Sequence, residues 1–224
     1  MTNEAYKLYV DEVVRRVETA RLNVSGHHIV KTVAVSKYST VEEIKALYEI
    51  GQRAFGENKV QDLKSKAKEL EDLPLEWHFI GNLQKNKINN LLDISPSLFH
   101  ALDSIELAQE LQKKLLAKEM TLNCLLQINS AKEESKHGFM PEEAIEKYLQ
   151  ITKECPNIRL KGVMSIGAHS KERESIKQSF ETTYAIYKQL PNATICSMGM
   201  SGDFELAIES GANMIRLGSI LFNE

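Results

Sequence analysis

The feature that most constrains the fold is a regular alternation of strand-like and helix-like segments along the chain. Several of the strand-like segments are almost continuously apolar, which is typical of parallel strands covered on both faces. Amphipathic helical patterns separate them. The eight strand-like segments are TVAVSK (32–37), RAFGEN (53–58), EWHFIGN (76–82), LFHALDS (98–104), TLNCLLQINS (121–130), IRLKGVMSIG (158–167), ATICSMGM (193–200) and NMIRLGSILF (213–222).

Eight strands joined by helices predict one α/β domain over residues 1–224 that closes into a (β/α)8 TIM barrel. A helical pattern at residues 4–23 precedes the first strand, and the chain is expected to end on the last strand. The extra N-terminal helix can therefore replace the missing eighth helix. An open doubly wound sheet is less favoured, because no glycine-rich dinucleotide fingerprint follows the first strand. Pro141 is expected to start a helix, and Gly51 and Gly211 to end helices.

Composition excludes several classes of protein. The net charge of -3 and pI near 6.1 give no reason to expect a nucleic-acid partner. The lysine-rich segment KVQDLKSKAKELED alternates with acids and is interpreted as a solvated helix face. Three separated cysteines, a polar N-terminus and the lack of a long apolar run predict a cytoplasmic protein with free thiols and no membrane contact. The histidines have no metal-ligand spacing, so no metal is expected.

Polar residues gather where the strands are predicted to end, which is where barrels of this kind place functional groups. Lys37 follows the first strand. Ser201 and Gly202 stand at the start of a helix after the seventh, and Gly218 and Ser219 follow the eighth. Free backbone N–H groups and close approach at glycine suit a phosphate group. Glycine-bearing turns occur in any barrel, so each turn alone is better explained by structure. Their pairing on adjacent strands makes a phosphate site an equal alternative.

Arg216 lies within an apolar segment, where a guanidinium needs partners. Either it makes a structural ion pair with a carboxylate or it is a fixed donor to a ligand. His78, in another apolar strand, is interpreted as a core histidine. A phosphate site, a lysine and an arginine together indicate an aldehyde that carries a phosphate, since a lysine amine shielded from water can form a Schiff base. Pyridoxal 5′-phosphate has these features.

Six motifs in the chain resemble, in order, those of the pyridoxal phosphate homeostasis proteins (the YggS-like family). They are AVSKYST, FGENKVQ, EWHFIGNLQKNK, INSAKEESKHGF, LKGVMSI and SMGMSGDFELAIESGANMIRLGSILF. The resemblance covers essentially the whole chain and implies a barrel like the N-terminal domain of alanine racemases. Asn82, Phe139 and the tail LFNE depart from the usual family pattern, but none lies in the lysine or phosphate motifs.

The resemblance implies a role for individual residues. Lys37 matches the Schiff-base lysine, Asn58 a residue lining the cofactor ring, and Arg216 the arginine facing the pyridine nitrogen, with Ser197 beside it. The remaining residues match the phosphate-holding turns. The complete implied cofactor site is Lys37, Asn58, Ser201, Arg216, Gly218 and Ser219.

The implied function is intracellular pyridoxal phosphate homeostasis, as a carrier or buffer without strong catalytic activity. Apo-enzymes that use the cofactor are the expected recipients, and a monomer is expected. Two alternatives stay open: a cofactor-dependent amino-acid racemase, of which weak activity is not excluded, and a Schiff-base barrel enzyme acting on a sugar phosphate. Against the racemase, an arginine at the pyridine nitrogen weakens the ring as an electron sink, and the barrel leaves no room for a second domain bearing a base.

Overall fold

The eight apolar segments form eight parallel strands in the computed structural model, which describes residues 3–133 and 136–222. The strands hydrogen-bond to one another in chain order, and the last pairs with the first to close a barrel. The predicted (β/α)8 barrel is confirmed. The strands are β1 (Lys31–Val35), β2 (Ala54–Glu57), β3 (Glu76–Phe79), β4 (Leu98–Leu102), β5 (Leu122–Ile128), β6 (Ile158–Ser165), β7 (Ile195–Ser197) and β8 (Met214–Leu217).

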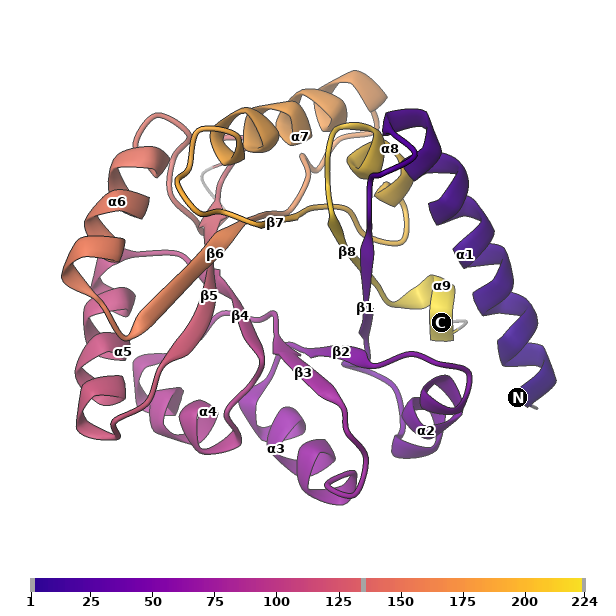
Figure 1. The fold of residues 1–224 in the computed structure, drawn as a ribbon, viewed down its shortest axis with the longest axis horizontal. Coiled ribbons are helices and arrows are strands. Elements are labelled where there is room, and N and C mark those ends of the chain that lie inside the picture. Colours follow the sequence, from indigo (N-terminus) through magenta and orange to yellow (C-terminus); the bar gives the residue numbers. More distant parts are fainter. Residues whose placement is uncertain (1–2, 134–135, 223–224) are drawn as a thin grey trace.

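Helices surround the barrel, as Figure 1 shows, because each has an apolar face that packs on the outside of the strands. In α2, for example, Val41, Ile44 and Leu47 are buried at helical spacing, and Thr40 and Glu43 form a capping box. The helices are α1 (Asn3–Val24), α2 (Val41–Glu49), α3 (Val60–Glu69), α4 (Ile88–Ile94), α5 (Ile105–Ala117), α6 (Ala144–Glu154), α7 (Arg173–Tyr187), α8 (Phe204–Glu209) and α9 (Ser219–Phe222), with a 3-10 turn η1 (Lys85–Lys87) before α4.

The expectation that the chain ends on the last strand was wrong. Strand β8 stops at Leu217, and the carbonyl of Gly218 accepts the N–H groups of Leu221 and Phe222, so the chain turns into the short helix α9. Helix α1 packs against α8 and α9, and in Figure 1 it lies between α8 and α2 on the outside of the barrel. The N-terminal helix therefore fills the gap in the ring together with α9.

The helix ends predicted from the two glycines were correct, whereas the helix start predicted from Pro141 was not. Gly51 and Gly211 have φ angles of 105° and 102°, the left-handed conformation that ends a helix, as predicted. Helix α6 begins at Ala144, so the expectation that Pro141 starts it was wrong. The carbonyl of Met140 accepts the N–H groups of Glu143 and Ala144, which places a turn between the proline and the helix.

Two further expectations concern the chain as a whole. The three cysteines, Cys124, Cys155 and Cys196, are buried free thiols, as predicted, and burial raises the pKa of each. Within residues 3–133 and 136–222, no helix combines the length and apolar character needed to span a membrane. The last two residues of the tail motif LFNE lie outside the described residues.

Candidate functional site

Lys37 lies in a tight turn at the carboxyl end of β1. The carbonyl of Ser36 accepts the N–H of Ser39 at 2.9 Å, which closes a four-residue turn with Lys37 and Tyr38 at its centre. The Lys37 side chain is partly buried, and its Nζ lies 4.8 Å from the centroid of the Tyr38 ring. No carboxylate in the described chain forms an ion pair with this amine. It is therefore available to a ligand at this end of the barrel.

The two glycine-bearing turns predicted to hold phosphate lie next to each other. The Ser201 hydroxyl, after β7, accepts the N–H of Gly218, after β8, at 3.2 Å. A Cβ at Gly218 would lie 3.4 Å from the carbonyl oxygen of Val35, at the end of β1, so this turn is close to the one that carries Lys37. Gly202 has open space around its Cβ position, and Ser219 is exposed. The three strand ends thus form one continuous polar edge.

Arg216 points into the barrel from β8 and is 5% exposed. Its Nη1 donates to the Ser197 hydroxyl at 2.7 Å, and its Nη2 donates to the Ser165 carbonyl at 2.9 Å. No carboxylate in the described residues lies within ion-pair distance, so the structural ion pair considered for this residue is not formed. Burial lowers the pKa of Arg216 to about 10, and the nearby Asp203 opposes this shift. The guanidinium is charged at neutral pH, and its charge is uncompensated at close range.

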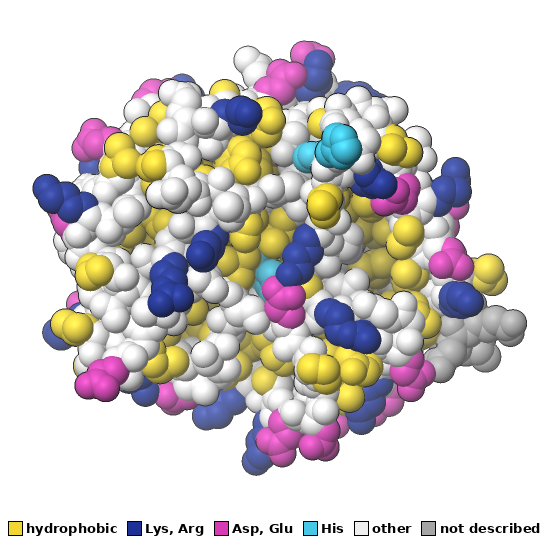
Figure 2. Space-filling model, viewed as in Figure 1, with side chains coloured by type: hydrophobic (Ala, Val, Ile, Leu, Met, Phe, Trp, Pro, Cys, Tyr) yellow, Lys and Arg dark blue, Asp and Glu magenta, His cyan; other side chains and the backbone are white. Residues whose placement is uncertain are grey.

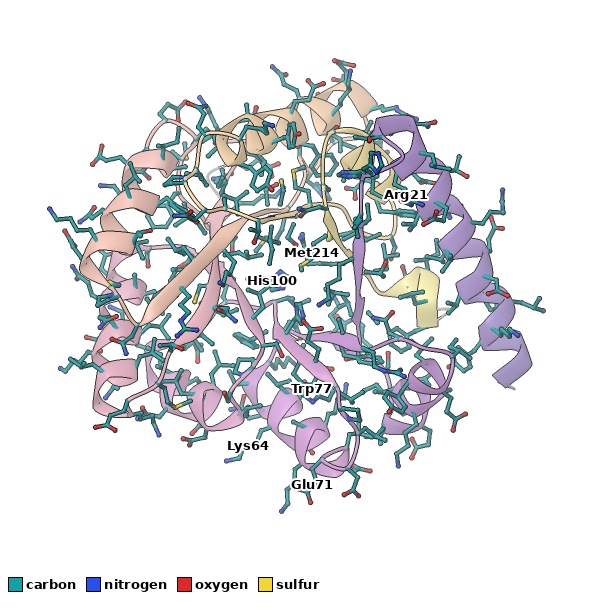
Figure 3. The ribbon with its side chains drawn as sticks, viewed as in Figure 1. Arg21, Lys64, Glu71, Trp77, His100 and Met214 are labelled. Atoms are coloured by element: carbon teal, nitrogen blue, oxygen red, sulfur yellow. The ribbon has the colours of Figure 1, made fainter. Side chains whose placement is uncertain are left out.

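A chain of buried polar groups continues from Arg216 across the barrel interior. The Ser197 hydroxyl lies 3.4 Å from His100 Nδ1, and His100 Nε2 lies 2.8 Å from His78 Nδ1. His78 Nε2 lies 3.2 Å from Glu76 Oε1, which in turn accepts from Lys31 Nζ at 2.5 Å. Figure 3 shows His100 inside the ring of strands. His78 is a satisfied, buried histidine, as predicted.

The hydrogen-bond partners of His78 and His100 indicate which nitrogen of each neutral imidazole carries the proton. Nε2 of His78 donates to the Glu76 carboxylate, so its Nδ1 accepts from His100, whose Nδ1 accepts from Ser197. Burial lowers the pKa of His78 and holds that of His100 well below its ordinary value, so both rings are neutral. The hydrogen bond from His78 is the main cause that lowers the pKa of Glu76 to about 2.

This polar chain reaches a hollow at the opposite end of the barrel. The hollow has a cavity volume of about 460 Å³ and includes Lys31, Glu76, His78 and Lys161 in its lining. Figure 2 shows it at the centre of the visible face, with a histidine on its floor between acidic and basic side chains. The polar chain therefore connects the amino-terminal face of the barrel with the end that carries the candidate site.

Asn58 reaches the same end of the barrel through an unusually close backbone contact. It directly follows β2 and is partly buried. A Cβ at Gly81, after β3, would lie 2.0 Å from the Asn58 carbonyl oxygen, so only glycine allows the two loops to approach. The predicted site residues all follow or lie in strands whose carboxyl ends meet at one mouth: Lys37, Asn58, Ser201, Arg216, Gly218 and Ser219.

Two residues beside Lys37 were missed by the sequence analysis. Glu57 is fully buried, and its Oε1 accepts from the Ser36 hydroxyl at 2.6 Å and from Lys66 Nζ at 2.8 Å. Lys66 lies on α3, in the segment interpreted as a solvated face, and that interpretation was wrong for this residue, whose side chain is 14% exposed. The available clue was an acidic residue at the end of an otherwise apolar strand.

Comparison with known proteins first defines the class of this barrel. The family model "Alanine racemase, N-terminal domain" matches residues 10–224. A crystal structure of an unknown protein from Bifidobacterium adolescentis superposes with a TM-score of 0.91 at 29% identity, covering 98% of this chain and 95% of that one. The barrel is thus one of the alanine racemase N-terminal domain class.

Closer relatives narrow the class to one family. A pyridoxal phosphate homeostasis protein of Helicobacter pylori (strain J99) is 54% identical over 219 residues, which cover 98% of this chain and 99% of the relative. The structure of PipY from Synechococcus elongatus with PLP bound is 31% identical and has a TM-score of 0.77, covering 92% of this chain and 99% of that one. The chain belongs to the family of pyridoxal phosphate homeostasis proteins.

Proposed function

We propose that this protein binds pyridoxal 5′-phosphate reversibly through Lys37 and acts as a carrier or buffer of the cofactor. The observation that carries the proposal is the hydrogen bond between Ser201 and Gly218, which joins two glycine-bearing turns beside the Lys37 turn. Support from outside the chain comes from its membership of the homeostasis family and from the PLP-bound relative PipY.

The residues present fit this group. A phosphate needs free N–H groups and room, which the open surroundings of Gly202 and the exposed Ser219 offer. A pyridine nitrogen needs a fixed donor, and Arg216 is held by two neutral oxygens, so its charge is free to act on a ligand. Asn58 lies at the same mouth, where it would line the ring.

Lys37 would hold the cofactor by a reversible covalent bond. The neutral form of its amine would add to the aldehyde carbon with loss of one water, to give a Schiff base. Attack by water would reverse the step and return the free aldehyde and the amine. When bound, the cofactor would supply a conjugated carbonyl. A protein that stops at this step limits the free aldehyde and releases it to apo-enzymes that use it.

Absence of strong catalysis follows from the same residues. Arg216, if it faces the pyridine nitrogen as the resemblance implies, would keep that nitrogen unprotonated and so weaken the ring as a sink for a carbanion. We therefore expect no strong racemase activity. A monomer is also expected.

The test is trapping of the bound cofactor. Protein mixed with pyridoxal 5′-phosphate should develop a visible absorption band, and borohydride should fix the label to the peptide that contains Lys37. Lys37→Ala should lose both, while Lys45→Ala, at an exposed site on α2, should keep both. Label on another lysine would contradict the proposal.

Two further measurements separate the alternatives. Exchange of the α-hydrogen of alanine in deuterium oxide should not exceed that of Lys37→Ala, and faster exchange would favour a racemase. A colourless protein that turns over a sugar phosphate would favour the barrel enzyme. Transfer to an apo-enzyme in the presence of an aldehyde trap would support a carrier, because released aldehyde would be captured before it could rebind.

A further inference from the structure

Every polar atom of Ser36, the residue before Lys37, makes a hydrogen bond. It is fully buried, and its N–H donates to the Gly56 carbonyl at 3.0 Å. Its hydroxyl donates to Glu57 Oε1 at 2.6 Å. Its carbonyl, which closes the turn around Lys37, accepts a second hydrogen bond from Lys66 Nζ at 2.6 Å. The first residue of the Lys37 turn is thus fixed by side chains from β2 and α3.

The Glu57–Lys66 ion pair is a costly way to stabilise a fold. Glu57 is completely removed from water, and its Oε2 has no hydrogen-bond partner. A buried carboxylate with an unpaired oxygen gives up hydration that the protein does not replace. Neutral residues of similar volume are often as stabilising as a buried ion pair, or more so. Stability alone therefore accounts poorly for this pair.

The direction in which the Ser36 side chain points explains how the Glu57–Lys66 pair can affect the position of Lys37. Successive side chains of an extended strand point to opposite faces. The Ser36 side chain points away from the barrel axis, toward Glu57 and the α3 residue Lys66. Lys37 follows Ser36 in the turn that begins where β1 ends, and Val35, the last residue of β1, lies against Gly218. A change in the Ser36 conformation would redirect the amine.

We propose that Glu57 and Lys66 are positioning residues for Lys37. They act through Ser36: the shared carboxylate oxygen fixes its hydroxyl, and the ammonium fixes its carbonyl, so that the turn presents the amine to the phosphate-holding edge. Neither residue needs to touch the cofactor. This inference rests on the proposed function, because it concerns the same lysine and the same bond.

The experiment compares a neutral pair with the native one. E57Q/K66M keeps the side-chain lengths and removes both charges together, so that no lone charge is left buried. K64M is the matched control, because Lys64 is an exposed lysine on the same helix and extends outward in Figure 3. The rate at which borohydride traps pyridoxal 5′-phosphate on Lys37 is measured by mass spectrometry of the peptide that contains this residue. Amide exchange of the peptide containing residues 36–40 is measured without cofactor, and denaturant unfolding gives the folded fraction.

We expect the double variant to unfold at the wild-type midpoint or above. Its trapping rate should fall about tenfold, since small displacements of a reacting group carry large rate penalties. Exchange in the 36–40 peptide should be about tenfold faster, and K64M should match wild type in all three. Trapping at the wild-type rate would overturn the inference, as would a decrease that only follows the folded fraction. Wild type that is not labelled at Lys37 would instead contradict the proposed function.

Discussion

A guanidinium inside a parallel barrel loses most of its hydration, and Arg216 recovers hydrogen bonds from neutral oxygens rather than from a carboxylate. Ser197 and the Ser165 carbonyl accept from it, and the nearest acid in its hydrogen-bonded chain is Glu76, beyond two neutral imidazoles. A carboxylate in direct contact would have neutralised the charge. Neutral acceptors fix the position of the group and leave its field available to a ligand.

Ser197→Ala tests this arrangement at a single atom. Removal of the hydroxyl leaves an Arg216 N–H and the His100 Nδ1 acceptor without partners in a site where Ser197 is fully buried. We expect the free energy of unfolding to fall by about 1–3 kcal/mol, the typical cost of unsatisfied buried groups. Denaturant titration measures it, with Ser65→Ala on the exposed face of α3 as the control. A loss equal to that of the control would show that the hydroxyl does not hold the guanidinium.

Gly218→Ala tests the proposed phosphate-holding edge. A Cβ there would make ordinary contacts of 3.4 Å and 3.6 Å with Val35, so the fold should change in stability by less than about 1 kcal/mol. In the proposed site, the added methyl group would restrict the approach of a phosphate to this stretch of backbone. We expect the dissociation constant of pyridoxal 5′-phosphate, measured by absorbance, to rise about tenfold, equivalent to about 1.4 kcal/mol. Gly26→Ala, with no neighbour within 4 Å, should leave it unchanged.

At the scale of elements, the mouth of the barrel is assembled from loops that contact one another directly, and one of these contacts is closer than a side chain permits. The loops after β2 and β3 meet where Asn58 contacts Gly81, and the loops after β7 and β8 meet where Ser201 contacts Gly218. Each contact uses a glycine backbone. The positions of the candidate ligand groups therefore depend on how the strands are staggered in the barrel, as well as on the residues themselves.

Gly81→Ala should disturb the first of these contacts. The new Cβ would lie 2.0 Å from the Asn58 carbonyl oxygen, a backbone atom that cannot rotate away. We expect a loss of about 2–4 kcal/mol in the free energy of unfolding, as in other overpacked sites. Gly56→Ala, whose Cβ would meet a Val33 methyl group at 3.2 Å, should cost less because a side chain can shift. Equal costs for the two variants would contradict the role of the backbone contact.

The elements themselves were largely predictable, because most buried strand residues are apolar and the apolar residues of the helices recur at helical spacing. What the sequence did not reveal were the places where a local hydrogen bond ends an element. The apolar run NMIRLGSILF continues through Gly218, and only the turn at its carbonyl separates β8 from α9. Likewise, a turn at Met140 delays α6 beyond Pro141.

The site was partly predictable for a similar reason. Residues at the ends of β1, β7 and β8 could be placed at one mouth from topology alone, and the Ser201–Gly218 contact agrees with that placement. Contacts between neighbouring elements could not be read from periodicity. Helical spacing gives the face on which Lys66 lies, but its buried partner Glu57 depends on how α3 packs over the barrel. The roles of these residues in cofactor binding stay predictions.

At the scale of the whole molecule, the two ends of the barrel share one hydrogen-bonded chain. It begins at the Lys31–Glu76 ion pair in the hollow of Figure 2 and passes through His78 and His100 before it reaches Ser197 and the candidate site. Every donor in the chain points toward Glu76 when both rings are neutral. A proton added to either imidazole would break this order, because the ring would lose an acceptor and gain a charge beside other buried groups.

This order makes the stability of the protein depend on pH. Burial lowers the pKa of both His78 and His100 in the folded state, so below their ordinary value of 6.5 the unfolded chain binds more protons. The stability due to neutral histidines is therefore present above pH 6.5 and is lost as the pH falls from that value through the lowered pKa values of the folded rings. We expect unfolding free energy to fall by about 1–3 kcal/mol between about pH 7.5 and 5.5, at up to about 1.4 kcal/mol per pH unit for each ring.

Denaturant titrations of the cofactor-free protein at constant ionic strength measure this slope. His100→Gln removes one of the two groups and should reduce the slope by about half, whereas His27→Gln, at an exposed site, should leave it unchanged. If His100→Gln is too unstable to titrate, the imidazole resonances of wild type give the same answer, because those of His78 and His100 should shift only below the ordinary pKa of 6.5. Ordinary titration of the two buried rings in the folded protein would show that the chain across the barrel also accommodates charged histidines.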